Sequence, residues 1–186
     1  MKPVLMIHEF QEEFLKLPLE QYILTFDDGL YSQYWFWDQH LKHLQTEKIF
    51  FISSGIICPE NTDQGNCFCS SFDAHLRAKS NIFSDYMKIS QIKELMKNSW
   101  VTIGGHGNSH LNLNDLTTLL GKVNHIKKDT TEMLDWFKEE LNFKPTHFAY
   151  PYNDDLDGMY SGLLKQCGFI HFFGRERIPI ETLLRN

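Results

Sequence analysis

The chain has 186 residues, of which 42% are hydrophobic and 14% aromatic, enough for one sizeable core but not for two ordinary domains. We therefore expect a single globular domain over residues 1–186. The formal net charge of −6, with only isolated Lys-Lys and Arg-x-Arg clusters, gives no basic footprint for nucleic acid or an anionic membrane.

The N-terminal segment, MKPVLMIHEF, contains only a short apolar run and no small-residue cleavage site. No later stretch has the roughly 20 consecutive apolar residues that a membrane-spanning helix needs. These features predict a soluble, cytoplasmic protein with no integral membrane segment.

Short apolar strands alternate with amphipathic helices along the chain. The apolar runs predict strands within residues 3–10, 22–28, 48–57, 100–107, 146–153 and 169–174. Helical periodicity predicts helices over residues 31–48, 88–99, 116–141 and 156–168. This alternation favours an α/β fold with a mainly parallel sheet, either open or closed into a barrel.

Between about residues 58 and 80, small, polar and cysteine residues replace the periodic pattern. This composition predicts an irregular excursion without a helix or strand. Cys58, Cys67 and Cys69, together with His75, could form a second zinc site, but they lack a paired C-x-x-C spacing. Free thiols are the expected state of these cysteines, because the chain has no secretion signal.

Two adjacent carboxylates, Asp27 and Asp28, follow a predicted strand in the sequence TFDDG. In parallel α/β folds the carboxyl ends of the strands form the functional face. Two ionised carboxylates tolerate each other there when a cation is present. Successive side chains at a strand end point in different directions, so the two acids can serve two tasks at one site.

The sequence GGHGNSH, at the end of another predicted strand, supplies His106 and His110. Their spacing of four residues predicts that both imidazoles lie on one face of a helical turn, as in other zinc motifs. One carboxylate and two histidines make a three-ligand site, which leaves positions open for water and substrate. An open metal site of this kind indicates catalysis.

TFDDG, the H-x-x-x-H of GGHGNSH, and FAYPY, in this order, resemble the polysaccharide deacetylases of the NodB-homology type, carbohydrate esterase family four. The resemblance spans roughly residues 4–177. It implies a distorted or incomplete (β/α) barrel and an enzyme that uses one divalent metal ion, expected to be zinc, to deacetylate an N-acetylated amino sugar. The implied roles are metal binding by Asp28, His106 and His110, general-base catalysis by Asp27, and substrate binding by Pro151 and Tyr152, with the Tyr152 amide at the oxyanion.

The chain departs from the commoner family pattern beside the base. Ala149 stands where many members have an arginine that pairs with the catalytic carboxylate. Arg175 and Arg177 are candidate replacements, although surface exposure is the default expectation for arginines near a terminus. Asn153 stands where the family usually has glycine, and asparagine also tolerates a left-handed turn.

The family's usual general acid, a histidine in a late Leu-x-His strand, has no counterpart in the sequence. VLMIH instead resembles the opening strand of a FAYPY-type subgroup, and this resemblance implies that His8 is the general acid. His171, inside the last predicted strand, is expected to be structural.

Two other classes of function stay open. One is a non-catalytic sugar-binding module of the same fold, and the other is a non-haem iron oxygenase, because two histidines and one carboxylate also form its facial triad. An aromatic run could offer a sugar-stacking surface, but such a run on a helix is more often core; its members are Tyr31, Tyr34, Trp35, Phe36 and Trp37.

The expected pathway is the synthesis of a surface polysaccharide, such as an O-antigen or a capsule. The sequence does not tell whether the sugar is free, nucleotide-linked, lipid-linked or oligomeric. It also leaves the oligomeric state open.

Overall fold

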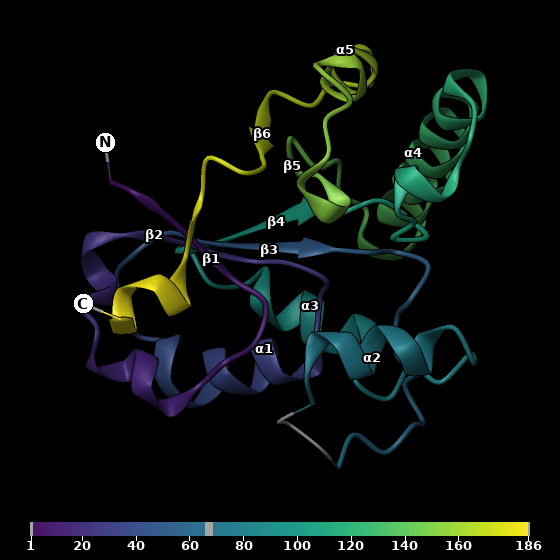
Figure 1. Ribbon diagram of the computed structural model, residues 1–186. Coiled ribbons are helices and arrows are strands. Elements are labelled where there is room, and N and C mark those ends of the chain that lie inside the picture. The colour runs from purple at the N-terminus through teal and green to yellow at the C-terminus, as the bar shows by residue number, and fades with distance from the viewer. Residues whose placement is uncertain (1, 66–68, 186) are drawn as a thin grey trace.

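Seven strands form one parallel sheet in the order β6-β5-β4-β3-β2-β1-β7 in the computed structural model, which describes residues 2–65 and 69–185 (Figure 1). Because β6 and β7 lie at opposite ends of this order, the curled sheet stays open as an incomplete (β/α) barrel. The fold class is therefore confirmed. The strands are β1 (Val4–Ile7), β2 (Ile23–Phe26), β3 (Lys48–Ile52), β4 (Val101–Gly105), β5 (His147–Ala149), β6 (His171–Phe173) and β7 (Ile178–Pro179).

Helices cover the sheet on both sides. In Figure 1, α1 and α3 lie below the central strands, whereas α4 and α5 lie above them. Every residue of β3 is buried, as expected for a central strand of a parallel sheet covered on both faces. The helices are α1 (Tyr31–Phe36), α2 (Ser71–Ala78), α3 (Ile89–Leu95), α4 (Leu119–Leu141) and α5 (Met159–Gln166). No helix in the described ranges is long and apolar enough to cross a bilayer.

The helix predicted over residues 31–48 is shorter than its periodicity suggests. A π-helical turn, Trp37–Leu41, follows α1, and Lys48 already begins β3. Phe36 and Trp37 are each 1% exposed and belong to the main hydrophobic core. The aromatic run therefore contributes its last two residues to core packing rather than to a surface platform.

The segment predicted to be irregular contains helix α2, so the prediction is wrong for these eight residues. The Oγ of Ser70 accepts a hydrogen bond from the Asp73 amide and caps the helix, and Ala74 anchors it in the protein. Cys58 and Cys69 are buried free thiols, while Cys67 lies outside the described residues. In the described part of the chain, the metal-ligand cluster that the structure forms contains neither of these two thiols.

Candidate active site

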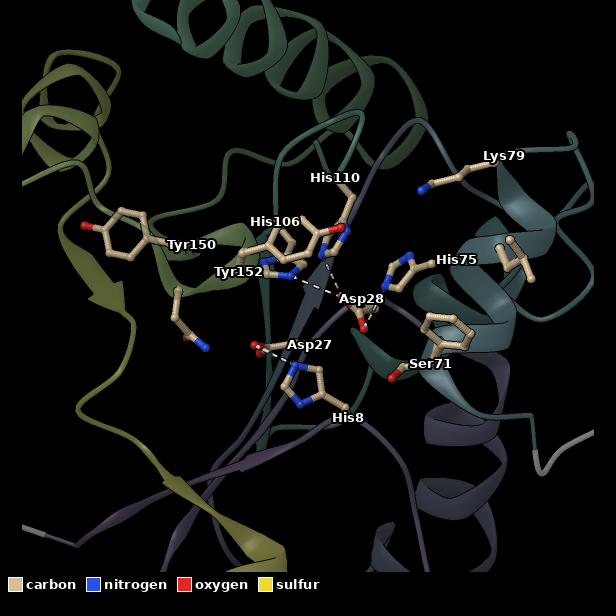
Figure 2. A pocket seen from close by; sticks show the side chains of 13 residues that line it. His8, Asp27, Asp28, Ser71, His75, Lys79, His106, His110, Tyr150 and Tyr152 are labelled. Carbon is tan, nitrogen blue, oxygen red and sulfur yellow. Dashed lines mark ion pairs between the residues drawn. The ribbon is translucent and has the colours of Figure 1, made fainter. Parts of the chain in front are cut away.

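The predicted functional residues converge at the carboxyl ends of neighbouring strands. His8 follows β1, Asp27 and Asp28 follow β2, and His106 follows β4. Beyond β5, a short 3-10 turn carries Tyr152 into the same region, where a cavity of about 380 Å³ opens (Figure 2). The cavity is lined by six of the seven predicted site residues, namely His8, Asp27, Asp28, His106, His110 and Tyr152. The seventh, Pro151, is buried next to Tyr152.

Asp28, His106 and His110 form a cluster whose donor atoms all lie within 4.8 Å of one another. The Oδ1 atom of Asp28 is 3.3 Å from the Nε2 of His106 and 3.0 Å from the Nε2 of His110. His106 donates from Nδ1 to the carbonyl oxygen of Ala149 at 2.8 Å. When this imidazole is neutral, its lone pair therefore lies on Nε2, as metal ligation requires. This donor set fits a divalent metal ion.

The two histidines do not share a helical turn, contrary to the sequence prediction. His106 continues the β4 strand, with its amide bonded to the Ile52 carbonyl, and a loop leads from it to His110. Gly107 and His110 have φ angles of 77° and 50°, in the left-handed region. These turns reverse the chain within four residues, so the imidazoles meet through loop geometry instead of helical spacing.

A buried carboxylate on α4 fixes this loop. Asp129 accepts hydrogen bonds from the amides of Asn108 and Ser109, at 2.7 and 2.8 Å, and from the Ser109 hydroxyl. The sequence contains a signal for it, because Asp129 lies on the apolar stripe of the helix between Ile126 and Met133. A carboxylate on a buried helix face needs partners there.

Arg177 supplies the arginine that many family members have at the position of Ala149. The expectation that Arg177 lies on the surface is wrong. It is 3% exposed and forms a bidentate pair with Asp27, with Nη1–Oδ1 and Nη2–Oδ2 distances of 2.6 and 2.7 Å. Arg175, two residues away, is exposed. The segment that leads into β7 thus brings a charge from the end of the chain to the strand-end acid of β2.

The two adjacent acids have different electrostatic partners. Burial raises the pKa of Asp27, but the charge and hydrogen bonds of Arg177 outweigh burial and lower it overall. Burial also raises the pKa of Asp28, whereas the charge of His110 and hydrogen bonds from the surrounding histidines hold it well below its usual value. Both acids are therefore ionised near neutral pH, each stabilised by its own set of cationic or hydrogen-bonding groups.

Several non-glycine residues around the cavity have left-handed backbone conformations. The φ angles are 78° at Asp28, 57° at Tyr152 and 55° at Asn153. Asn153 accepts a hydrogen bond from Arg177 at 3.0 Å, so the residue at the usual glycine position also orients the arginine. Such strained conformations cluster at functional sites, where the surrounding structure holds them.

His8 points into the cavity beside the predicted base. Its Nε2 lies 3.8 Å from the Oδ2 of Asp27, and its side chain is 36% exposed. The buried side chain of Gln33 donates hydrogen bonds to the carbonyl oxygens of both His8 and Asp27, which ties β1 to β2 at this point. His171 lies elsewhere, at the first residue of β6, where its ring stacks on His147.

His75, which the sequence grouped with cysteines as a possible second zinc site, lies instead beside Asp28. It projects from α2 into the cavity, with Nε2 3.2 Å from the Oδ2 of Asp28 (Figure 2). It therefore belongs to this site rather than to a cysteine cluster. Sequence reasoning had no spacing rule that relates residue 75 to Asp28.

An incomplete (β/α) barrel with two acids and two histidines at its strand ends is the arrangement of a carbohydrate deacetylase of the NodB type. Residues 18–169 match the polysaccharide deacetylase family, and the chain belongs to that family. No curated protein sequence matches the chain significantly.

Solved structures show the same fold. IcaB from Ammonifex degensii aligns with a TM-score of 0.68 at 21% identity, covering 92% of this chain and 82% of that one. A de-N-acetylase from Aggregatibacter actinomycetemcomitans aligns with a TM-score of 0.62 at 16% identity, covering 91% and 70%. The Streptococcus pyogenes deacetylase PplD, in complex with acetate, gives 0.57 at 15% identity, covering 99% and 96%.

Proposed function

We propose that this chain, acting as a single domain, is a metal-dependent N-deacetylase that hydrolyses the acetamide of an N-acetylated amino sugar. The observation that carries the proposal is the separation of the two adjacent acids into two environments. Asp27 is paired with Arg177, whereas Asp28 faces His106 and His110. One acid is thus available as a base and its neighbour as a metal ligand.

Asp28, His106 and His110 would hold one divalent ion, and zinc suits a set of two imidazoles and a carboxylate. When bound, such an ion supplies Lewis acidity, which makes a water molecule more acidic and the acetamide carbonyl more electrophilic. Three protein ligands leave room in its coordination sphere for substrate. All three ligands line the cavity, so a substrate in the cavity would lie beside the ion.

Asp27 is the proposed general base. Arg177 occupies one acceptor position on each carboxylate oxygen and holds the group in a fixed orientation. Each oxygen keeps a second acceptor position. Asp27 takes a proton from the attacking water, whose oxygen bonds to the acetyl carbon.

His8 and Tyr152 complete the reaction in this proposal. The backbone N–H of Tyr152 donates to the oxyanion of the tetrahedral intermediate. The C–N bond then breaks as the protonated imidazole of His8 gives its proton to the leaving amine and becomes neutral. The products are acetate and the free amino sugar.

We infer that a sugar unit occupies the cavity. Its volume of about 380 Å³ lies within the usual range for small-molecule sites. The pathway we propose is the synthesis of a surface polysaccharide such as an O-antigen or a capsule. Free, nucleotide-linked, lipid-linked and oligomeric carriers of the N-acetylated sugar all stay candidates.

The function is tested by measuring acetate release from a panel of N-acetylated sugars on these four kinds of carrier, with zinc present. We expect one carrier class to release acetate and expose a free amine in equal amounts. O-acetylated analogues of the same sugars serve as controls for esterase activity. Binding of the sugars without release of acetate from any of them would support a non-catalytic module instead.

Replacing Arg177 with Met should move the acidic limb of the kcat/KM profile to higher pH. Arg177 lowers the pKa of Asp27 against the opposing effect of burial, so its removal leaves burial to raise that pKa. Breaking the buried pair should also lower the free energy of unfolding by about 3–5 kcal/mol at neutral pH. Because the pKa of Asp27 is lowered in the folded state, this stabilisation is lost as pH falls through the folded-state pKa.

Arg175→Met is the matched control, because Arg175 is exposed two residues away. Urea unfolding at several pH values and the pH profile of kcat/KM provide the two measurements. An acidic limb at the same pH in Arg177→Met and in the parent protein would show that Arg177 does not tune the base.

A further inference from the structure

Helix α2 supplies one wall of the cavity although it lies outside the TFDDG, H-x-x-x-H and FAYPY motifs. Its residues Ser71, Phe72, His75 and Leu76 line the cavity. The family resemblance assigns no role to this segment, and the sequence analysis expected it to be irregular. The position of His75 is therefore a property of this chain that needs its own explanation.

Polar contacts on both sides of His75 dock α2 on the rest of the protein. The carboxylate of Glu9, next to His8, accepts hydrogen bonds from the amide and hydroxyl of Ser71 at 2.8 and 3.0 Å. Arg77 donates from Nε to Asp85 at 2.6 Å. These contacts hold the helix at both ends, so the backbone that carries His75 has a defined place at the cavity.

The hydrogen bonds of His75 define its protonation pattern. Its Nε2 lies 3.2 Å from the Oδ2 of Asp28, and its Nδ1 lies 2.9 Å from the hydroxyl oxygen of Tyr86. An ionised carboxylate only accepts hydrogen bonds, so Nε2 carries the proton that faces Asp28. In the neutral imidazole, Nδ1 then accepts a hydrogen bond from the Tyr86 hydroxyl. Tyr86 is fully buried, which fixes the position of this donor.

The carboxylate of Asp28 is thereby divided between two sets of partners. Its Oδ1 faces the Nε2 atoms of His106 and His110, whereas its Oδ2 faces His75. In Figure 2, His106 and His75 lie on opposite sides of Asp28. A hydrogen bond to Oδ2 leaves Oδ1 as the oxygen directed at the two other ligands.

The ring geometry argues against His75 as a further ligand. The rings of His75 and His110 stack at a centroid distance of 4.3 Å with an angle of 9° between their planes. A metal ion lies close to the plane of each imidazole that binds it. Two nearly parallel stacked planes do not meet at a common point beside the rings, so His75 and His110 cannot both point at one ion in this arrangement.

We propose that His75 is a positioning residue that orients Asp28 as a ligand through Oδ1, with Tyr86 holding His75 in the required tautomer. The proposal rests on the metal site of the proposed function. Outer partners of metal ligands fix their orientation, and their loss typically weakens metal affinity about 10–100-fold.

The test measures zinc affinity by competition with a chromophoric chelator, and ligand set by the visible spectrum of the Co²⁺ form. His75→Ala should weaken zinc binding about 10–100-fold. His75→Gln should recover part of the affinity, because its amide can donate to Oδ2 from a similar position. Tyr86→Phe should give an intermediate loss. The Co²⁺ band positions of His75→Ala should match those of the parent protein, because the ligands are unchanged.

His43→Ala is the matched control, since His43 is exposed and outside the cavity. The double variant His106→Ala, His110→Ala gives the zinc binding that remains when two of the three proposed ligands are removed. Parent-like affinity in His75→Ala would overturn the positioning role while leaving the proposed function intact. Shifted Co²⁺ bands in His75→Ala, together with no recovery of zinc affinity in His75→Gln, would show that His75 is itself a ligand and would overturn the positioning role. A parent protein with no more zinc than the double variant would contradict the proposed metal site itself.

Discussion

Replacing Asp27 with Asn is expected to lower kcat/KM by about a hundredfold to ten-thousandfold while the zinc content stays at the parent level. An amide cannot accept the proton of the attacking water. The proposed metal site uses the neighbouring Asp28, whose partners are histidines rather than Arg177. The Asp27→Asn variant should therefore lose catalytic rate but not bound zinc.

The matched variant is Asp28→Asn, which changes the adjacent acid in the same way. It should lose zinc as well as activity, because a neutral amide is a weaker metal ligand than a carboxylate. Circular dichroism checks that both variants fold, since Asp27→Asn leaves Arg177 buried without its counter-charge. Near-parental turnover of Asp27→Asn would reassign Asp27 to a structural role.

His8→Ala is expected to reduce turnover by about a hundredfold to ten-thousandfold, whereas His171→Ala should leave it unchanged. An amine anion is a very poor leaving group, so amide hydrolysis needs a proton donor near the breaking bond. His8 lines the cavity 3.8 Å from Asp27, while His171 is the exposed first residue of edge strand β6.

The comparison is most informative on two substrates. An acetylated sugar amide needs protonation of its leaving group, whereas a phenyl acetate ester has a leaving group that departs as an anion. His8→Ala should lose much more activity on the amide than on the ester. Equal losses on both, or an inactive His171→Ala beside an active His8→Ala, would remove His8 from the role of general acid.

The fold could be predicted because its elements are locally encoded. Period-two and continuous apolar runs mark β1 to β6, and the 23-residue helix α4 follows a long apolar stripe. β7 was not predicted, because it has two residues and one of them is Pro179. Helix α2 was not predicted either, since a capping serine and one buried alanine anchor it among polar residues.

The residues of the candidate site also divide into those that local sequence predicts and those that only the folded chain brings to the site. Asp27, Asp28, His106 and His110 occur in short motifs at predicted strand ends, so their convergence follows from the parallel topology. Arg177 and His75 reach the site from segments that no periodicity relates to it. Arg177 pairs with a residue 150 positions away, and only the folded chain brings the two together.

Acetate release measured before and after removal of bound metal tests the central claim most directly. The claim is that Asp27 and Asp28 serve one metal-dependent hydrolytic site. The account predicts that the chelated protein releases no acetate from its N-acetylated sugar, and that added zinc restores equal amounts of acetate and free amine. An undiminished rate in the metal-free protein, or turnover that requires iron and consumes dioxygen, would contradict it.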